Sequence, residues 1–172
     1  MDVKEAIQKR HSVRSFSDKK PSKDLIQEII KHAHLAPSAG NLQARDFIII
    51  DDEEQKKGLS RASLNQMFIA EAPINIVVCA NLNRVSSYGA RGKELYCIQD
   101  SAAAVEHILL LAVDNGLGAC WVGAFNENEV SKILELPPHV RPVAIIPIGY
   151  PKDRVTPTSR IDTKILTHHN KW

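Results

Sequence analysis

The sequence lacks the features on which several large protein classes depend. Its 172 residues carry 22 Lys and Arg against 20 Asp and Glu, a net charge of only +2, and this balance does not suit electrostatic binding of nucleic acid. No apolar run has the length that spans a bilayer, and residues 1–5 lack the basic-then-apolar order of a signal peptide. We therefore expect a cytoplasmic protein with no nucleic-acid partner and no membrane partner.

Cysteine is scarce, and so are the usual catalytic arrangements. Cys79, Cys97 and Cys120 are far apart and form no C-x-x-C pair, so they read as reduced core thiols, with a catalytic cysteine as the weaker alternative. His32 and His34 would project from different helix faces and make a poor metal pair. The sequence shows no metal-ligand cluster, no Ser-His-Asp order and no G-x-G-x-x-G after a strand. We expect neither a metal site nor a Rossmann fold.

The composition, with 44% apolar residues, is that of one ordinary globular domain spanning residues 1–172. Cap residues and the helical spacing of apolar side chains predict helices over 2–9, 22–36, 51–62, 93–115 and 126–136. Short apolar runs predict strands over 47–50, 74–80, 119–123 and 142–149. Residues 81–92 have no periodicity and are expected to form a mobile loop or lid.

Two segments suggest a second subunit. Between Ser101 and Val113 the longest helix is apolar almost all round, which is typical of a helix buried on every side. A chain this small would struggle to cover it, so we expect a dimer interface there. Residues 151–172 read as an extended polar tail, but Ile165, Leu166 and Trp172 near its end indicate that it docks on another surface.

A basic stretch at residues 10–16, with the sequence R-H-S-V-R-S-F, is the strongest candidate for a binding site. One guanidinium group can donate two parallel hydrogen bonds to phosphate oxygens, and serine hydroxyls can donate to the oxygen lone pairs that remain. The alternative is a solvated basic turn. Residues 37–43, P-S-A-G-N-L-Q, form a second candidate. Small residues let backbone approach a ligand and amides both donate and accept, although a plain connector can have this composition.

Three motifs in order resemble the FMN-dependent nitroreductase family: R-x-S-x-R-x-F at 10–16, P-S-x-x-N-x-Q at 37–43 and G-L-G-x-x-W-x-G at 116–123. The resemblance runs from about Val3 to Arg160. It implies an α+β fold, with a mixed central β-sheet flanked by helices, in an interlocked homodimer whose C-terminal tails reach the partner. It also implies FMN at the interface and ping-pong hydride transfer from NAD(P)H to a nitroaromatic, quinone or similar small acceptor. The flavin carries this chemistry, so no catalytic side chain is expected.

The resemblance assigns the first motif to the cofactor. Arg10 and Ser12 would hold the FMN phosphate and ribityl chain with His11 beside them, and Arg160 would reach the phosphate from the tail. Arg14 would lie at the pyrimidine edge of the ring, where a fixed positive charge stabilises the negative charge that reduction brings.

The other implied cofactor contacts come from three places. The partner subunit would supply Pro37, Ser38, Ala39 and Asn41, while Gln43 would serve the structure of the loop. The strand end along the flavin would be Trp121, Val122, Gly123 and Ala124. The Gly123 backbone N–H would point at flavin N5, and Trp121 has a rival role as a core aromatic. Asn65 would hydrogen-bond the ring, unless it only forms a turn.

The chain departs from the family pattern at two positions, and the resemblance leaves other activities open. Ala44-Arg45 replaces the common Pro-Trp, and we expect Arg45 to alter the rim of the site and favour an anionic substrate. Phe68 stands where some members carry a basic flavin contact, which leaves more of that role to Arg14. The alternatives are an oxygen-dependent enzyme that consumes reduced FMN, a non-enzymatic FMN-binding redox sensor, and a phosphate-binding domain without flavin.

Overall fold

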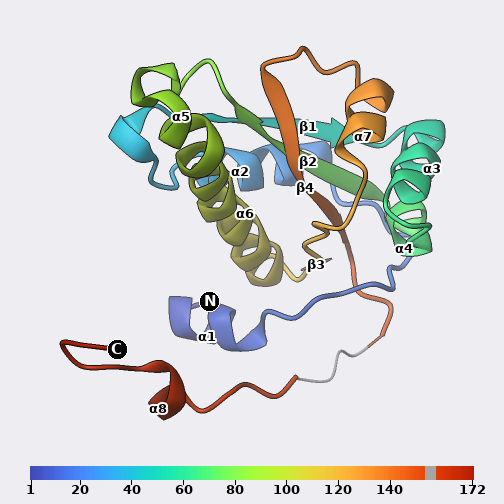
Figure 1. The fold of residues 1–172 in the computed structure, drawn as a ribbon. Helices are drawn as coiled ribbons and strands as arrows, with labels where there is room; N and C mark the ends of the chain where they lie inside the picture. Colours follow the sequence, from blue (N-terminus) through green and yellow to red (C-terminus); the bar gives the residue numbers. More distant parts are fainter. Residues whose placement is uncertain (154–157) are drawn as a thin grey trace.

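The computed structural model describes residues 1–153 and 158–172. An antiparallel sheet of four strands in the order β1-β2-β4-β3 lies at its centre (Figure 1). The strands are β1 (Arg45–Ile50), β2 (Ile74–Asn81), β3 (Gly118–Ala119) and β4 (Val140–Gly149). The helices are α1 (Val3–Lys9), α2 (Lys23–Ala33), α3 (Glu53–Ala62), α4 (Met67–Glu71), α5 (Gly89–Arg91), α6 (Cys97–Asp114), α7 (Glu127–Ile133) and α8 (Thr163–Leu166). Short 3₁₀ turns span Ala39–Asn41 and Ser86–Tyr88, and a π-helical turn spans Gly92–Tyr96.

The predicted helix caps are confirmed. The side chains of Asp2, Ser22 and Asn126 each accept hydrogen bonds from backbone N–H groups of the first turn of α1, α2 and α7. Such caps satisfy donors that the helix itself leaves free. Glu5 does not complete a capping box, because its carboxylate pairs with Lys9 at 2.6 Å instead.

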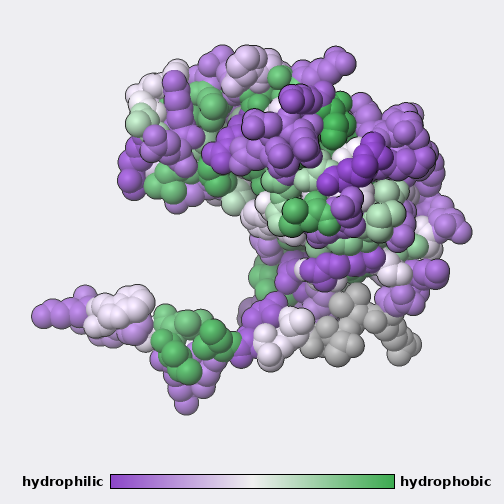
Figure 2. Space-filling view, turned by 45° about the vertical axis from the view of Figure 1, so that its right-hand side comes forward, coloured by the Kyte–Doolittle hydropathy of each residue, from purple (hydrophilic) through white to green (hydrophobic). Residues whose placement is uncertain are grey.

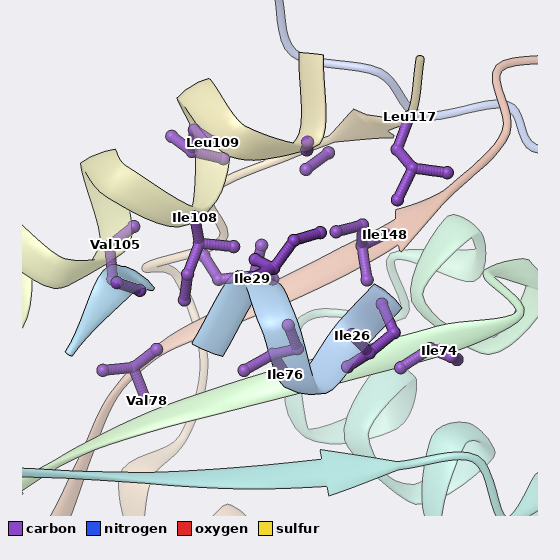
Figure 3. Packing of buried hydrophobic residues seen from close by; sticks show 14 of the residues in the cluster. Ile26, Ile29, Ile74, Ile76, Val78, Val105, Ile108, Leu109, Leu117 and Ile148 are labelled. Atoms are coloured by element: carbon purple, nitrogen blue, oxygen red, sulfur yellow. The ribbon is translucent and has the colours of Figure 1, made fainter. Parts of the chain in front are cut away.

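Strand alternation divides the core into two layers, one on each face of the sheet. β2 is buried over its whole length, as predicted. Ile76 and Val78 face α2 and α6, whereas Val77 and Cys79 face α3 and α7. Figure 3 shows the first layer, in which isoleucines of α2 interlock with side chains of α6, β2 and β4. The protein is therefore an α+β sandwich of helices, sheet and helices.

α6 is a core helix on one side only. Ala104, Val105, Ile108 and Ala112 are fully buried, but the opposite side is only half-buried. A single chain therefore leaves this helix partly uncovered, as expected from the sequence, and the dimer interface expected there stays a prediction. In the described part of the chain, Ser86–Asp114 is the one helical stretch that is long and apolar enough to cross a membrane. This stretch contains the core helix α6, whose buried face packs against the sheet, so it does not contradict the expectation that no run spans a bilayer.

Three other expectations are corrected. Within the part of the chain that the structure describes, the sheet is not mixed, because every strand pair is antiparallel and the parallel pairing is limited to one isolated bridge, Ser12 to Ala119. The third strand has only two residues, followed by a bridge from Val122 to Ile145. Residues 81–92 are not a loop throughout, because helical turns at Ser86–Tyr88 and Gly89–Arg91 and the start of the turn Gly92–Tyr96 lead into α6. Periodicity failed there because these turns are too short to present one apolar face.

The end of the chain stands away from the body. Figure 2 shows the last residues of the chain as an arm with a hydrophobic patch, and a wide gap separates the outer part of this arm from the body. Ile161, Ile165 and Leu166 are each more than 60% exposed. The arm therefore exposes a short apolar surface.

The three cysteines are free and buried, as predicted. Burial, with a smaller contribution from Asp46, raises the pKa of Cys79 from 9.0 to about 12, and burial also raises the pKa of Cys97 and Cys120. Since the unfolded thiol ionises first, the stability that Cys79 contributes is present below pH 9 and is lost between pH 9 and about 12.

We expect a thiol-specific chromogenic reagent to label none of the cysteines in the native protein below pH 9. The thiolate is the reactive form, and burial suppresses both ionisation and access. In denaturant all three should react within minutes. Rapid labelling of one thiol in the native state would show that the thiol is accessible and would contradict the buried assignment.

Candidate functional site

The basic stretch lies extended along the end of the sheet. Val13 donates its N–H to the Ala119 carbonyl at 3.0 Å, next to the Ser12–Ala119 bridge. A Cβ added to Gly118 would lie 2.5 Å from a Val13 methyl carbon. Glycine at 118 is therefore what allows the stretch to press against β3.

Alternation along this extended stretch places Arg10 and Ser12 on one side. Both line a cavity of about 430 Å³ together with Trp121 and Arg160. These four residues come from the first motif, the third motif and the tail, and the structure brings them together. Trp121 is 40% exposed, so it is a cavity wall rather than the core aromatic that was its rival interpretation.

His11 lies on the other side of the stretch. It lines a separate cavity, also of about 430 Å³, with Lys9, Val13 and Asp153. The structure therefore does not place His11 beside Arg10 and Ser12. The period of two in an extended segment is a sequence signal that could have predicted this separation.

Arg14 lies on the same side of the stretch as Arg10 and Ser12, next to α4. Its guanidinium carbon lies 5.9 Å from the centre of the Phe68 ring, at cation–π distance. Cys120 lies close by: burial raises the pKa of its thiol, while the charges of Arg14 and Arg10 and the Ser12 hydroxyl act in the opposite direction. Arg14, Phe68 and Cys120 thus extend the Arg10 side of the site.

Residues 122–124 form the next part of the wall. Val122 is buried and pairs with Ile145, whereas Gly123 and Ala124 are exposed. In residues 1–153 and 158–172 the Gly123 N–H donates to no protein carbonyl, so it is available to a ligand. The Ala124 carbonyl accepts from Gln66 Nε2 at 3.4 Å, which ties this wall to the turn before α4.

Asn65 belongs to that turn but faces elsewhere. It adopts a left-handed φ of 57°, consistent with a turn-forming asparagine. Asn65 lines a cavity of about 360 Å³ together with Met67 and Glu71, and this cavity is distinct from the one that Arg10 lines. The structure therefore leaves Asn65 outside the group formed by Arg10, Ser12, Trp121 and Arg160.

Residues 37–43, which we call the amide loop, are built by internal hydrogen bonds. Ser38 Oγ accepts from the Gln43 N–H at 3.0 Å, and Gln43 Nε2 donates to the Asn41 carbonyl at 2.9 Å. The predicted structural role of Gln43 is confirmed. A Cβ on Gly40 would lie 2.5 Å from the Tyr88 hydroxyl, so the loop also packs against the turns before α6.

The amide loop and the Arg10 cavity lie at different points along α6. Ala39 donates its N–H to Asp100 near the start of the helix, whereas Glu106 and Leu109 line the cavity. At 1.5 Å per residue these positions are about 9–14 Å apart along the helix axis. One chain therefore does not bring Pro37, Ser38, Ala39 and Asn41 to Arg10.

Arg45 corrects an expectation. It is 2% exposed, and it donates to the carbonyls of His34 at 2.7 Å, Pro37 at 3.1 Å and Asp100 at 3.2 Å. Burial lowers the pKa of its guanidinium, and the charge of Asp100 partly opposes that shift. A buried side chain bound to backbone cannot be the rim contact for an anionic substrate that the sequence suggested.

Sequence reasoning missed two walls of the Arg10 cavity. Glu106 and Leu109 reach it from α6, and Ile7 reaches it from α1. No motif marks these residues, and only the crossing of the two helices brings them there. The described residues contain no group of three or more His, Cys, Asp or Glu that could hold a metal ion.

Known proteins resemble this chain in sequence and in fold over most of its length. The model of the nitroreductase family matches residues 7–73 and 62–150. A nitroreductase family protein from Clostridium novyi superimposes with a TM-score of 0.81 at 37% identity, covering 89% of this chain and 87% of that one. NfrA2 of B. megaterium superimposes with a TM-score of 0.94 at 28% identity, covering 100% and 76%.

The sequence relatives agree with the structural ones. An FMN reductase [NAD(P)H] of Bacillus subtilis is 28% identical over 188 residues, which cover 99% of this chain and 74% of the relative. An FMN reductase (NADPH) of the same organism is 27% identical over 182 residues, covering 98% and 73%. With the family match extending over most of the chain, this protein belongs to the nitroreductase family.

Proposed function

We propose that this protein is an FMN-dependent oxidoreductase that takes electrons from NAD(P)H and passes them to small acceptors such as nitroaromatics or quinones. The observation that carries the proposal is the cavity where Arg10, Ser12, Trp121 and Arg160 meet. The names of the FMN reductases among its relatives support the choice of cofactor and donor. The free thiols suit a reducing compartment, and we propose a cytoplasmic location.

The residues of the cavity fit a phosphate. Two guanidinium groups, Arg10 and Arg160, approach it from different segments, and the Ser12 hydroxyl lies between α1 and the sheet. Guanidinium groups match phosphate oxygens with pairs of parallel donors, and a hydroxyl can fill a remaining position. The Trp121 side chain supplies an apolar wall, and Glu106 on the far wall limits where a second anion could lie.

The residues beyond the cavity fit a flavin ring. When bound, FMN supplies reversible hydride transfer, so the protein needs no acid, base or nucleophile of its own. Arg14, steadied against Phe68, would hold a positive charge beside the ring before reduction begins. The free N–H of Gly123 would donate to flavin N5. Each of these groups is set in place by the fold, so none has to reorganise during the reaction.

The site is completed by a second copy of the chain in this proposal. The amide loop lies too far along α6 to reach its own cavity, but a partner arranged along the half-buried side of α6 could supply Pro37, Ser38, Ala39 and Asn41. The extended arm with Ile161, Ile165 and Leu166 would dock on that partner and interlock the dimer. Asn65 would join the ring contacts by turning from its present hollow.

The first test is the absorbance spectrum of the purified protein. We expect flavin bands, and we expect them to bleach under anaerobic NADH or NADPH and to recover when a quinone or a nitroaromatic is added. Bleaching followed in air by permanent loss of the flavin bands and the appearance of cleaved flavin products would instead support the oxygen-dependent alternative. A yellow protein that neither nicotinamide bleaches would be a sensor, and a colourless protein that refuses added FMN would contradict the proposal.

A further inference from the structure

The amide loop holds an unusual backbone for an exposed connector. Gly40, Asn41 and Gln43 all have left-handed φ values, between 51° and 55°. Two of these residues are not glycine, and a backbone of this kind persists only where its surroundings hold it firmly. The contacts that maintain this backbone therefore bear on the function of the loop.

Arg45 holds the loop from behind. It begins β1, and its guanidinium donates to the carbonyls of His34, Ala36, Pro37 and Asp100. The first three carbonyls belong to the turn that leads from α2 into the loop. One planar group thus fixes the entry of the loop, the start of β1 and the helix α6 to one another.

Asp100 holds the loop from the side of α6. It is 4% exposed, and its Oδ1 accepts from the Ala39 N–H at 2.9 Å. Its Oδ2 is buried and has no protein partner among the described residues. A buried carboxylate with one free oxygen costs desolvation energy, and among the described residues the one hydrogen bond of this carboxylate goes to the backbone of the loop.

A connector that only joined a helix to a strand would not need two buried charges. Glycine caps and turn residues stop a helix without desolvating an ion. Arg45 and Asp100 instead give the loop a fixed shape before any ligand arrives. A preformed loop binds more tightly because no ordering cost is left to be met on binding.

We infer that Arg45 and Asp100 are positioning residues, which set FMN affinity by holding the amide loop in its binding shape without touching the cofactor. This inference rests on the proposed function. In a homodimer these residues would act on the cofactor held mainly by the other subunit, so each chain would tune the site of its partner.

The test compares FMN dissociation constants of full-length apoprotein variants, measured by flavin fluorescence. We expect Arg45→Met to weaken binding by about 10-fold or more, since it removes the bonds of a charged donor. Arg45→Lys keeps the charge but loses the planar guanidinium group, so its FMN affinity should lie between those of the wild type and Arg45→Met. Asp100→Asn should weaken binding, and the double variant should lose less than the sum of the single losses, because both act through one loop.

Arg141→Met is the matched control. Arg141 is exposed, and its guanidinium forms an ion pair with Glu127 at 2.7 Å on a different element. We expect this variant to bind FMN like the wild type. Thermal unfolding of each apoprotein is recorded in parallel, since a merely structural role would lower the melting temperature and leave FMN affinity of the folded protein unchanged.

Each outcome has one meaning. Wild-type FMN affinity in folded Arg45→Met, or in Arg45→Lys and Asp100→Asn if the methionine variant does not fold, would overturn this inference and leave the proposed function intact. Failure of the wild-type protein itself to bind FMN would overturn the proposed function and this inference with it.

Discussion

Replacement of Arg10 by alanine is expected to weaken FMN binding by about 10- to 100-fold while most of the secondary structure remains. Arg10 lines the cavity just after α1 ends and belongs to neither core layer. The change removes a charge-assisted contact to phosphate worth about 1.5–3 kcal/mol. The measurement is titration of apoprotein with FMN, with far-ultraviolet circular dichroism as the check on folding.

Lys9→Ala is the control for Arg10→Ala. Lys9 is the adjacent cation, but it lines the cavity on the His11 side and pairs with Glu5 at 2.6 Å. If the loss of one positive charge alone weakened FMN binding, both variants would lose affinity alike. If Arg10 contacts the phosphate, only Arg10→Ala loses affinity. Equal FMN affinity in Arg10→Ala and the wild type would remove the central support for the phosphate site.

Removal of residues 158–172 is expected to have the second large effect, conversion to a monomer that no longer retains flavin. The arm carries Arg160, which lines the cavity, and the exposed side chains Ile161, Ile165 and Leu166. In water such side chains contribute stability only when another surface covers them. Light scattering after gel filtration gives the mass, and the ratio of flavin to protein absorbance gives the occupancy.

Arg160→Ala in the full-length chain separates the two roles of the arm. It should remain dimeric and lose only part of its flavin affinity, because the apolar docking residues are intact. A truncated protein that stays dimeric and yellow would show that the arm is dispensable for both. A truncated protein that is dimeric but colourless would assign the arm to the cofactor and not to the interface.

Local rules predicted local structure well. The caps at Asp2, Ser22 and Asn126 begin helices as predicted, and the unbroken apolar run of β2 is buried. These features depend on neighbours within a few residues, which the sequence displays directly. The family match is confirmed. Of the residues that the resemblance assigned to the FMN phosphate, Arg10, Ser12 and Arg160 line one cavity together with Trp121, whereas His11 lines another.

Two of the failures share one cause, which is dependence on distant parts of the chain. Arg45 has the charge of a surface residue, and nothing near it in sequence signals that the carbonyls at the end of α2 converge on it. The direction of β3 depends on where the chain returns after α6, so the mixed sheet was wrongly predicted. The side of the stretch that His11 occupies was predictable from alternation, but the resemblance assigned it by proximity alone.

The extended form of residues 10–16 makes their spacing intolerant of length changes. A helix that gains or loses one residue turns its side chains by about 100°, whereas an extended segment reverses every one of them. One deletion between Arg10 and Ser12 would exchange, on one side of the deletion, the side chains that line the Arg10 cavity for those that line the His11 cavity. We therefore expect insertions of one residue among related proteins in the turns around Ser86–Tyr88 and not within residues 10–16. The reason is that an odd number of added residues reverses the side chains of an extended segment, whatever the residue type.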